Sequence, residues 1–467
     1  MDASSVSPSM ASVPTSRLLP IRTPRSAPAE WTTTDDSSAA TEEPVTPTAR
    51  LMEAIYIVVT IGLGSPVNLP VFSAGVAAEL ARYARFRSIQ VTDGSKDGNS
   101  PRWARTAVNV EDHMIVPTLD PAAMEADPDR AVEDYVASVY TLPMDCSRPL
   151  WEFHFLDFPT STVVFRVHHS LSDGMSLITM LLASARSAAD PTRLPAMPEP
   201  PARTGAIYVP WRREPTSPGA LAAFITWIWP YLVLAWKTMV DVSLFAATTL
   251  FLRDPCTPFR RADGDVTLNP CRRFVHRSLS LDDVKFVKNA MSCTVNDVLV
   301  GATSAALSRY YFRKSGGSNT YRTWLRSVLL VNTRPTASLQ TYANMIESGR
   351  SNDVAWGNQL GYILLPFHLA MHDDPLAYVR EAKMTVDRKK SSLEAIFTCK
   401  ISEVFVKMFG LKALIVHYQS YNNTIKIVLS VDEEIFPDYN QLLGDFAVSF
   451  GLIKDAASRL SESIKKE

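Results

Sequence analysis

The order of apolar and polar positions predicts alternating strands and helices from about residue 46 onward. Runs rich in β-branched and aromatic residues predict buried strands over 54–63, 114–117, 150–158, 162–167, 273–279, 325–331 and 362–367. Apolar residues at helical spacing predict helices over 72–84 and 129–140, after Gly174, after Ser280, and after either Thr294 or Asn296. This alternation is typical of sheets flanked by helices.

Changes in composition divide the chain into four parts. Residues 1–45 are rich in Ser, Thr, Pro and Ala without hydrophobic periodicity, which predicts a disordered segment. Closely spaced prolines after residue 194 exclude a helix or an interior strand, so a first lobe is expected over 46–193 and a linker over 194–264. The second lobe is then 265–467. At 467 residues the chain is about three times a single-domain length, which favours two lobes.

The linker contains a long apolar stretch. Residues 221–236 include three tryptophans and no charged side chain, and a second apolar stretch covers 242–252. A membrane-spanning helix needs about 20 apolar residues, and Pro230 interrupts this one. The pattern therefore favours a helix in the membrane interface, or one that re-enters the membrane, over a spanning helix. A helix buried between the lobes is the alternative.

Composition narrows the classes of partner and of chemistry. The formal net charge is −1, with 46% hydrophobic and 20% charged residues, so a small or lipid-like partner fits better than nucleic acid. The five cysteines form no C-x-x-C pair, which is typical of reduced thiols in a cytosol-facing protein. The sequence has no phosphate-binding loop, complete dinucleotide fingerprint, H-E-x-x-H motif or G-x-S-x-G elbow. Chemistry without a covalent nucleophile remains.

A pair of histidines stands between a predicted buried strand and a predicted helix, in His168-His169-Ser170-Leu171-Ser172-Asp173-Gly174. Neighbouring strand residues point to opposite faces, so a metal chelate by both imidazoles is disfavoured. Asp173 begins the helix, where the helix dipole favours a carboxylate, so a structural role suits it better than proton transfer. A neutral histidine could instead take the proton of an alcohol that attacks a carbonyl. Histidines at strand ends are more often structural, but this combination of residues is rare by chance.

The pattern His-His-x-x-x-Asp-Gly resembles the active-site motif of CoA-dependent acyltransferases and of condensation domains of peptide synthetases. Other blocks resemble, in order, those of the plant wax ester synthase/diacylglycerol acyltransferase family: Pro101-Arg102-Trp103, Asp112-His113, Ser147-Arg148-Pro149-Leu150-Trp151-Glu152, Thr294-Val295-Asn296-Asp297-Val298-Leu299, Asn332-Thr333-Arg334-Pro335 and Gly357-Asn358-Gln359-Leu360-Gly361-Tyr362. The resemblance covers the chain from about residue 46 to its end.

This resemblance implies an α/β fold of two lobes, similar to chloramphenicol acetyltransferase, with an active-site tunnel between the lobes. It also implies that an acyl group passes from acyl-CoA, a substrate, to a long-chain alcohol or diacylglycerol, without a cofactor or metal. His169 is the expected general base, with His168 supporting it, and Asp173 and Gly174 complete the motif. The expected location is the cytosolic face of the endoplasmic reticulum membrane, peripheral or single-pass, with the plasma membrane or a plastid as alternatives.

Four more residues are expected to bind substrate or support the site: Arg82, Asn296, Asp297 and Arg334. Arg82 lies in Arg82-Tyr83-Ala84-Arg85-Phe86, which resembles the family block Arg-His-Pro-Arg-Phe, and by resemblance to condensation domains it would pair with Asp173. A solvated charge on a helix is the alternative. The Asn-Asp pair resembles an active-site element of the second lobe, although a helix cap would explain it too.

The chain departs from the family after Phe409-Gly410-Leu411. Plant members carry a strand and a loop there with a Ser-Asn-x-x-Gly-Pro block, and by this resemblance roughly three dozen residues are missing. A weakly active or inactive protein that binds lipid or regulates is therefore one alternative function. A soluble plant acyltransferase of the same fold, acting on phenolics or alkaloids, is another, but the Asp-Phe-Gly-Trp-Gly block of those enzymes is absent.

Overall fold

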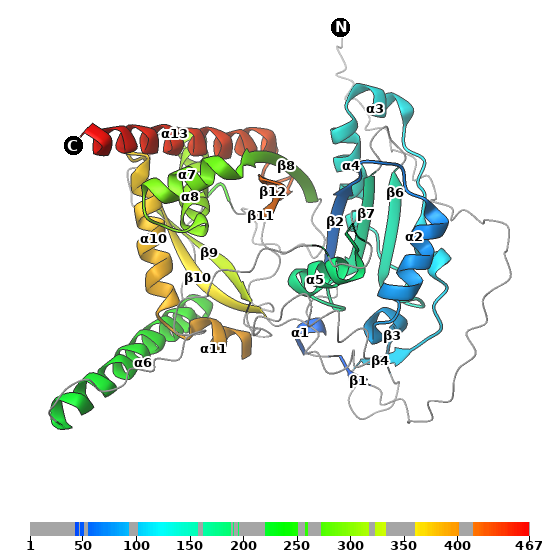
Figure 1. Cartoon of the computed structure of the whole chain (residues 1–467), viewed down its shortest axis with the longest axis horizontal. Coiled ribbons are helices and arrows are strands. Elements are labelled where there is room, and N and C mark those ends of the chain that lie inside the picture. The colour runs from blue at the N-terminus through cyan, green and yellow to red at the C-terminus, as the bar shows by residue number, and fades with distance from the viewer. Residues whose placement is uncertain are drawn as a thin grey trace, which may run out of the picture.

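The computed structural model describes residues 43–45, 47–50, 55–92, 101–156, 162–187, 190, 195, 220–250, 257–259, 272–316, 323–332, 360–400 and 414–466. In these residues the chain forms two lobes, each with sheets flanked by helices, which confirms the predicted fold class (Figure 1). Most of the predicted disordered segment, most of the proline-rich part of the linker and the predicted shortened segment lie outside the described residues.

The first lobe is built on a four-stranded sheet in the order β2-β7-β6-β5. Its central strand β7 (Thr162–His168) runs antiparallel to β2 (Tyr56–Gly62) and to β6 (Trp151–Leu156), and β6 is parallel to β5 (Met114–Ile115). Six of the seven residues of β7 are buried, because the sheet is covered on both faces. In this register Tyr56 stands opposite the final residue of β7, His168.

Helices and a small second sheet complete the first lobe. Asn68 caps the start of helix α2 (Leu69–Gly75), which continues into a π-helical turn, Val76–Leu80. The helix predicted over 72–84 therefore begins and ends earlier than expected. Helix α4 (Pro128–Thr141) matches its prediction, and α5 (Gly174–Ser184) follows the histidine motif. The remaining elements are α1 (Pro47–Arg50), α3 (Pro121–Ala126), the 3₁₀ turns Ala84–Arg87 and Val110–His113, and the sheet of β1 (Glu43–Pro44), β4 (Arg102–Arg105) and β3 (Ser88–Val91).

The second lobe contains two antiparallel sheets. One has the order β11-β12-β8, and the other pairs β10 with β9; their strands are β8 (Arg272–Ser280), β9 (Thr323–Asn332), β10 (Leu360–Leu369), β11 (Leu414–Tyr421) and β12 (Thr424–Asp432). In the described residues, long helices pack around them: α7 (Leu281–Ala290), α8 (Val295–Lys314), α10 (Leu376–Lys390) and α13 (Tyr439–Lys466). Helix α8 is largely buried between α10 and α13, so the second lobe has its own core.

A short helix, α11 (Glu394–Lys400), covers the edge of β10 that faces away from β9. The backbone N–H of Tyr362 donates to Thr398 Oγ1 over 2.8 Å, and that of Leu364 donates to Glu394 Oε1 over 3.1 Å. Thr398 Oγ1 also donates to the Tyr362 carbonyl over 2.6 Å. Side chains of a helix therefore satisfy backbone groups that a neighbouring strand would normally pair.

The lobes meet where α4 of the first packs against β8 of the second. The rings of Tyr140 and Phe274 lie edge to face with centroids 5.1 Å apart. Around this contact the guanidinium of Arg273 donates to Asp134 of the first lobe, and His276 Nδ1 lies 3.1 Å from a carboxylate oxygen of Glu133. An apolar centre with charges around it thus joins the lobes.

Helix α6 (Ala220–Leu250) projects from the second lobe (Figure 1). The predicted apolar stretches form one continuous helix that contains Pro230, and only 17% of its most apolar stretch is buried. Its C-terminal half is attached to the lobe through Phe245, which packs on Tyr362 and Leu364 of β10. The alternative of a helix buried between the lobes is therefore wrong.

Candidate active site

The two histidines lie where β7 ends, as predicted, because the chain turns sharply after His168. The backbone N–H of His168 donates to the Leu150 carbonyl over 3.0 Å, and that of His169 donates to the Ile55 carbonyl over 2.9 Å. The Leu171 N–H then donates back to the His168 carbonyl over 3.0 Å and closes the turn. Backbone from both sides therefore fixes the position of the pair.

The two imidazoles have different surroundings. His168 is 6% exposed, and its ring meets that of Tyr56 edge to face with centroids 5.4 Å apart. Its Nδ1 lies 2.6 Å from Ser170 Oγ. His169 is only half-buried. Of the two side chains, that of His169 is thus the more accessible to a substrate.

Asp173 caps the helix that follows, as the sequence predicts. Its side chain is fully buried, and its Oδ1 accepts the backbone N–H of Ser176 over 3.0 Å at the start of α5. Gly174 is the first residue of this helix, and no described atom lies within 4 Å of the place where a Cβ would stand. The structure therefore gives no steric reason for glycine at position 174.

Arg82 differs from Asp173 in exposure. The Arg82 side chain is 45% exposed, and its Nη1 lies 3.9 Å from Glu79, three residues earlier in the chain. Asp173, by contrast, has no exposed surface. The ion pair between Arg82 and Asp173 remains a prediction.

The second-lobe candidates begin helix α8. Thr294 is the cap: its Oγ1 accepts the Asp297 N–H over 3.2 Å, and Asp297 Oδ2 accepts the Thr294 N–H over 2.8 Å, so the two form a capping box. Asp297 is fully buried, whereas Asn296 is exposed. Helix capping therefore accounts for Thr294 and one oxygen of Asp297. The other oxygen, Oδ1, is buried without a hydrogen bond to any described residue. Arg334 lies outside the described residues.

Behind the motif lies a buried polar cluster that the sequence analysis did not single out. Arg166 of β7 donates to Glu152 of β6 over 3.1 Å, and its guanidinium lies 4.3 Å from the ring centre of Tyr56. Burial alone would raise the pKa of Glu152, but the neighbouring His154 and Arg166 outweigh it and hold that pKa below its usual range. Glu152 and Arg166 stand opposite each other in neighbouring strands that are otherwise mostly apolar. A charged residue in each of two such strands is the sequence pattern that could have predicted this cluster. Through Tyr56 the cluster supports the ring of His168.

Two sequence blocks far apart in the chain meet in a hollow of about 290 Å³. It is lined partly by Asp112, His113, Ser147 and Arg148, and Arg148 Nη1 donates to the Asp112 carbonyl over 2.7 Å. His113 stacks on Trp151 with centroids 4.0 Å apart, and its Nδ1 lies 2.6 Å from the Trp151 carbonyl. These blocks thus have a visible structural role in holding β6. Among the described residues, no group of three or more His, Cys, Asp and Glu could hold a metal ion.

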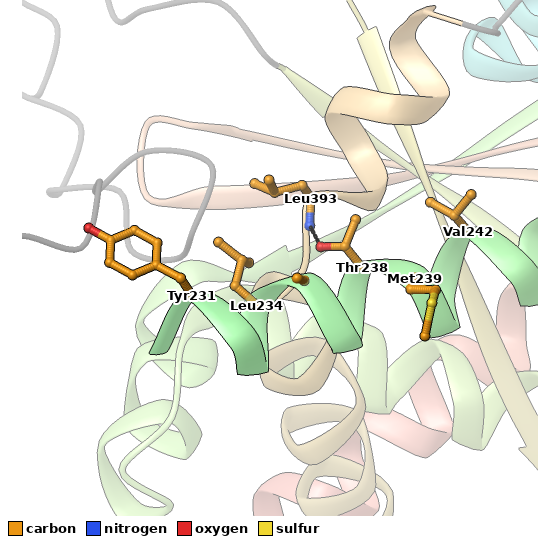
Figure 2. A pocket seen from close by; sticks show the side chains of 7 residues that line it. Tyr231, Leu234, Thr238, Met239, Val242 and Leu393 are labelled. Atoms are coloured by element: carbon orange, nitrogen blue, oxygen red, sulfur yellow. Dashed lines mark hydrogen bonds between the residues drawn. The ribbon is translucent and has the colours of Figure 1, made fainter. Parts of the chain in front are cut away.

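A second, apolar hollow of about 420 Å³ runs along α6 (Figure 2). Its wall consists of Tyr231, Leu234, Ala235, Thr238, Met239, Val242 and Leu393. The Leu393 N–H donates to Thr238 Oγ1 over 3.0 Å, which ties the beginning of α11 to the helix. The hollow is open to the surface, and its wall comes from α6 and the residue before α11, so it belongs to the projecting helix and not to the histidine motif.

The two lobes, with a histidine pair at the end of a strand, place the chain among proteins with the two-lobed fold of chloramphenicol acetyltransferase. Among solved structures, the chain is similar to the wax ester synthase/diacylglycerol acyltransferase from Marinobacter aquaeolei VT8, with 16% identity, a TM-score of 0.53, and coverage of 89% of this chain and 100% of that one. It is also similar to the first condensation domain of the calcium-dependent antibiotic synthetase, with 13% identity, a TM-score of 0.57, and coverage of 90% and 97%. At these identities the similarity shows the shared fold.

Sequence comparison gives the family. The wax ester synthase/diacylglycerol acyltransferase catalytic domain matches residues 66–299, and the C-terminal domain of the same family matches 356–415 and 411–454. Wax ester synthase/diacylglycerol acyltransferases 11 and 4 of Arabidopsis thaliana are each 36% identical to the chain, over 89% and 90% of it and over 95% and 91% of their own lengths. The chain belongs to the wax ester synthase/diacylglycerol acyltransferase family, and the predicted resemblance is confirmed.

Proposed function

We propose that the protein is an O-acyltransferase that transfers a fatty acyl group from acyl-CoA to a long-chain alcohol, to diacylglycerol, or to both. The observation that carries this proposal is the half-buried His169, fixed at the end of β7 beside a capped helix, in a chain of this family. Acyl-CoA is a substrate in this reaction, and the proposal invokes no cofactor or metal.

The proposed reaction is a direct displacement with His169 as the general base. His169 takes the hydroxyl proton while the alcohol oxygen attacks the thioester carbonyl, so a C–O bond forms and the C–S bond breaks. The departing CoA thiolate then recovers the proton from the imidazolium. Holding both substrates together replaces an acyl-enzyme intermediate. His168 and Asp173 support the base and its turn.

Purified protein incubated with palmitoyl-CoA and either hexadecanol or diacylglycerol tests the proposal through its lipid products. We expect His169→Ala to lower turnover by about 10²- to 10⁴-fold, because a general base contributes about this much. His168→Ala should lower turnover less. Circular dichroism of both variants controls for folding. Equal losses in the two variants would refute the assignment of the base, and absence of either ester from the wild-type reaction would refute the function.

A catalytically silent lipid-binding protein is the second candidate. The C-terminal domain of the family matches in two pieces that meet at residues 411–415, next to the predicted shortened segment. The 483-residue alignment with the Arabidopsis relative 11 is also longer than this chain of 467 residues, so that relative has positions without a counterpart here. Retained binding of acyl-CoA without turnover would favour this candidate.

We further propose that α6 binds a membrane surface, on the cytosolic side of the endoplasmic reticulum. Its exposed side chains include Trp229 and Trp236, each 63% exposed, and such aromatic residues favour the membrane interface. Pro230 cannot donate a backbone hydrogen bond within the helix, which suits an interfacial helix better than a spanning one.

Flotation with phosphatidylcholine vesicles tests this membrane proposal. The wild type should float with the vesicles, and Trp229→Glu/Trp236→Glu should stay in solution. The matched control is Trp324→Glu, which changes an equally large side chain, 49% exposed, on β9 of the same lobe. Flotation of the double variant, or its loss in the control, would contradict attachment through α6.

A further inference from the structure

A chain of hydrogen bonds leads from the small sheet to the first histidine of the motif. Gln90 of β3 donates through Nε2 to Ser170 Oγ over 2.8 Å. Ser170 Oγ lies 2.6 Å from His168 Nδ1, and the backbone N–H of Ser170 donates to the same Nδ1 over 3.2 Å. Ser170 is 1% exposed, so water does not compete for these bonds. The chain of bonds therefore joins β3 to the end of β7, two strands of different sheets, through the turn that holds Ser170.

The direction of each bond follows from the donors and acceptors present. A backbone N–H can only donate, so His168 Nδ1 must accept, which leaves the proton of the neutral ring on Nε2. The Ser170 hydroxyl must then also donate to Nδ1, because two lone pairs facing each other at 2.6 Å would repel. With its proton used in this way, Ser170 Oγ accepts from the Gln90 amide. The backbone N–H therefore selects one tautomer, and the serine hydroxyl and the Gln90 amide are oriented consistently with it.

We propose that Gln90 and Ser170 are positioning residues that hold His168 as the neutral tautomer with its proton on Nε2. In this state Nδ1 has no lone pair left for a substrate, so His168 acts as a fixed hydrogen-bond donor through Nε2–H. Proton abstraction is then left to His169. This inference rests on the proposed acyl transfer for its effect on rate, but the tautomer itself can be measured without turnover.

The test uses the full chain labelled with ¹⁵N in its histidine rings, because NMR correlations between ring nitrogens and carbon-bound protons show which nitrogen carries the proton. His168→Gln identifies the His168 signals. Gln90→Glu is the decisive variant, because a carboxylate accepts the Ser170 hydroxyl proton and reverses the relay. The Ser170 oxygen then faces Nδ1 with a lone pair over 2.6 Å and favours a proton there, against the longer and weaker 3.2 Å bond from the Ser170 backbone N–H. Gln441→Glu, an exposed position on α13, is the matched control for the added charge.

We expect the wild type and Gln441→Glu to show His168 protonated on Nε2 alone, and Gln90→Glu to shift the proton to Nδ1. The double variant Gln90→Glu/Ser170→Ala should lose this shift, because the serine oxygen transmits it. In acyl transfer, Gln90→Glu should lower kcat by roughly 10- to 100-fold with little change in KM, as expected for a partner that orients a functional histidine. Matched melting temperatures control for folding.

Several outcomes would overturn the inference. A proton on Nδ1 in the wild type, or an unchanged His168 spectrum in Gln90→Glu, would refute the relay. A shifted spectrum with unchanged kcat would refute its role in positioning. If the spectra behave as expected but the wild type makes no ester, the proposed acyl transfer fails and the relay stands.

Discussion

In each lobe a buried carboxylate lies at the start of a helix, and its hydrogen bond to the backbone there explains why it is buried. Asp173 at α5 and Asp297 at α8 are both fully buried, and each accepts a hydrogen bond from a backbone N–H at its helix start. A capping carboxylate contributes about 0.5–2 kcal/mol to stability. A structural function therefore accounts for a residue that its motif alone would mark as catalytic.

We expect Asp173→Ala to lower the free energy of unfolding by about 1 kcal/mol, because it removes the cap of α5. Asp173→Asn retains an oxygen acceptor and should lose less. Denaturant unfolding and the acyl transfer assay should change together in the alanine variant. Asp120→Ala, at the exposed cap of α3, is the control and should lose stability without losing activity. An alanine variant of Asp173 with full stability and no activity would instead indicate a direct chemical role.

Local signals in the sequence locate the histidines and their helix cap, because strand runs and capping residues act over a few neighbouring positions. Such signals do not predict the residues that hold the His168 ring in place. Gln90 lies 80 positions from Ser170, and Arg166 reaches Tyr56 only through the pairing of β2 with β7. These contacts depend on which strands become neighbours, which periodicity alone does not determine.

The attachment of helix α6 rests on buried charge. Asp241 is 1% exposed and accepts hydrogen bonds from Arg388 over 2.8 Å and from Lys389 over 3.2 Å. Lys389 also donates to the buried Glu394 over 2.8 Å, which links α6, α10 and α11. Burial alone would raise the pKa of Asp241, but the bond from Arg388 and the nearby Lys389 outweigh it and lower that pKa. Asp241 therefore stays ionised in the folded protein.

We expect Asp241→Ala to loosen α6 and to lower stability by about 1–3 kcal/mol, because Arg388 and Lys389 lose a buried acceptor while Lys389 keeps its bond to Glu394. Hydrogen exchange over α6 should rise in this variant. The control Asp387→Ala removes an exposed i,i+4 pair with Lys383 and should cost about 0–1 kcal/mol. Unchanged exchange in α6 after Asp241→Ala would show that apolar contacts alone hold the helix.

The contact of α11 with β10 requires a glycine. A Cβ at Gly361 would lie 2.1 Å from the backbone oxygen of Ala395, so Gly361→Ala should force the helix away and cost about 1–3 kcal/mol. Gly444→Ala is the matched control, because α13 leaves open space there, and it should stabilise the chain by about 0.5–1 kcal/mol. Thermal unfolding measures both. Equal melting temperatures of the two variants would contradict the close packing of α11.

At the scale of the whole molecule, a buried histidine makes stability depend on pH. Burial lowers the pKa of His113, which is 2% exposed, below the usual value of about 6.5. The unfolded chain therefore binds protons that the folded chain does not, so stability is full above about pH 6.5 and falls as the pH decreases below it.

We expect the melting temperature to fall between pH 7 and 5.5, and His113→Phe to reduce this slope, because phenylalanine keeps the stack on Trp151 but cannot bind a proton. Thermal scans at several pH values measure this slope. An identical slope in the wild type and in His113→Phe would assign the pH dependence to other groups.

The two-lobed arrangement follows from the order of predicted elements and from the family resemblance, but the position of α6 does not. The composition of α6 is equally consistent with a buried helix and an exposed one, and its attachment depends on Asp241 meeting residues some 147 positions away. The small sheet of β1, β4 and β3 is also unexpected, because its strands are too short to show a period.

The covered edge of β10 limits how a longer relative could be arranged. Thr398 and Glu394 already occupy the N–H groups of Tyr362 and Leu364, so a strand spliced in after Leu411 could not pair there without lifting α11. Moving α11 would also separate Glu394 from Lys389, which binds Asp241 of α6, and so disturb the attachment of α6. An insertion more than 150 residues after the end of α6 would thus affect the helix that we expect to touch the membrane.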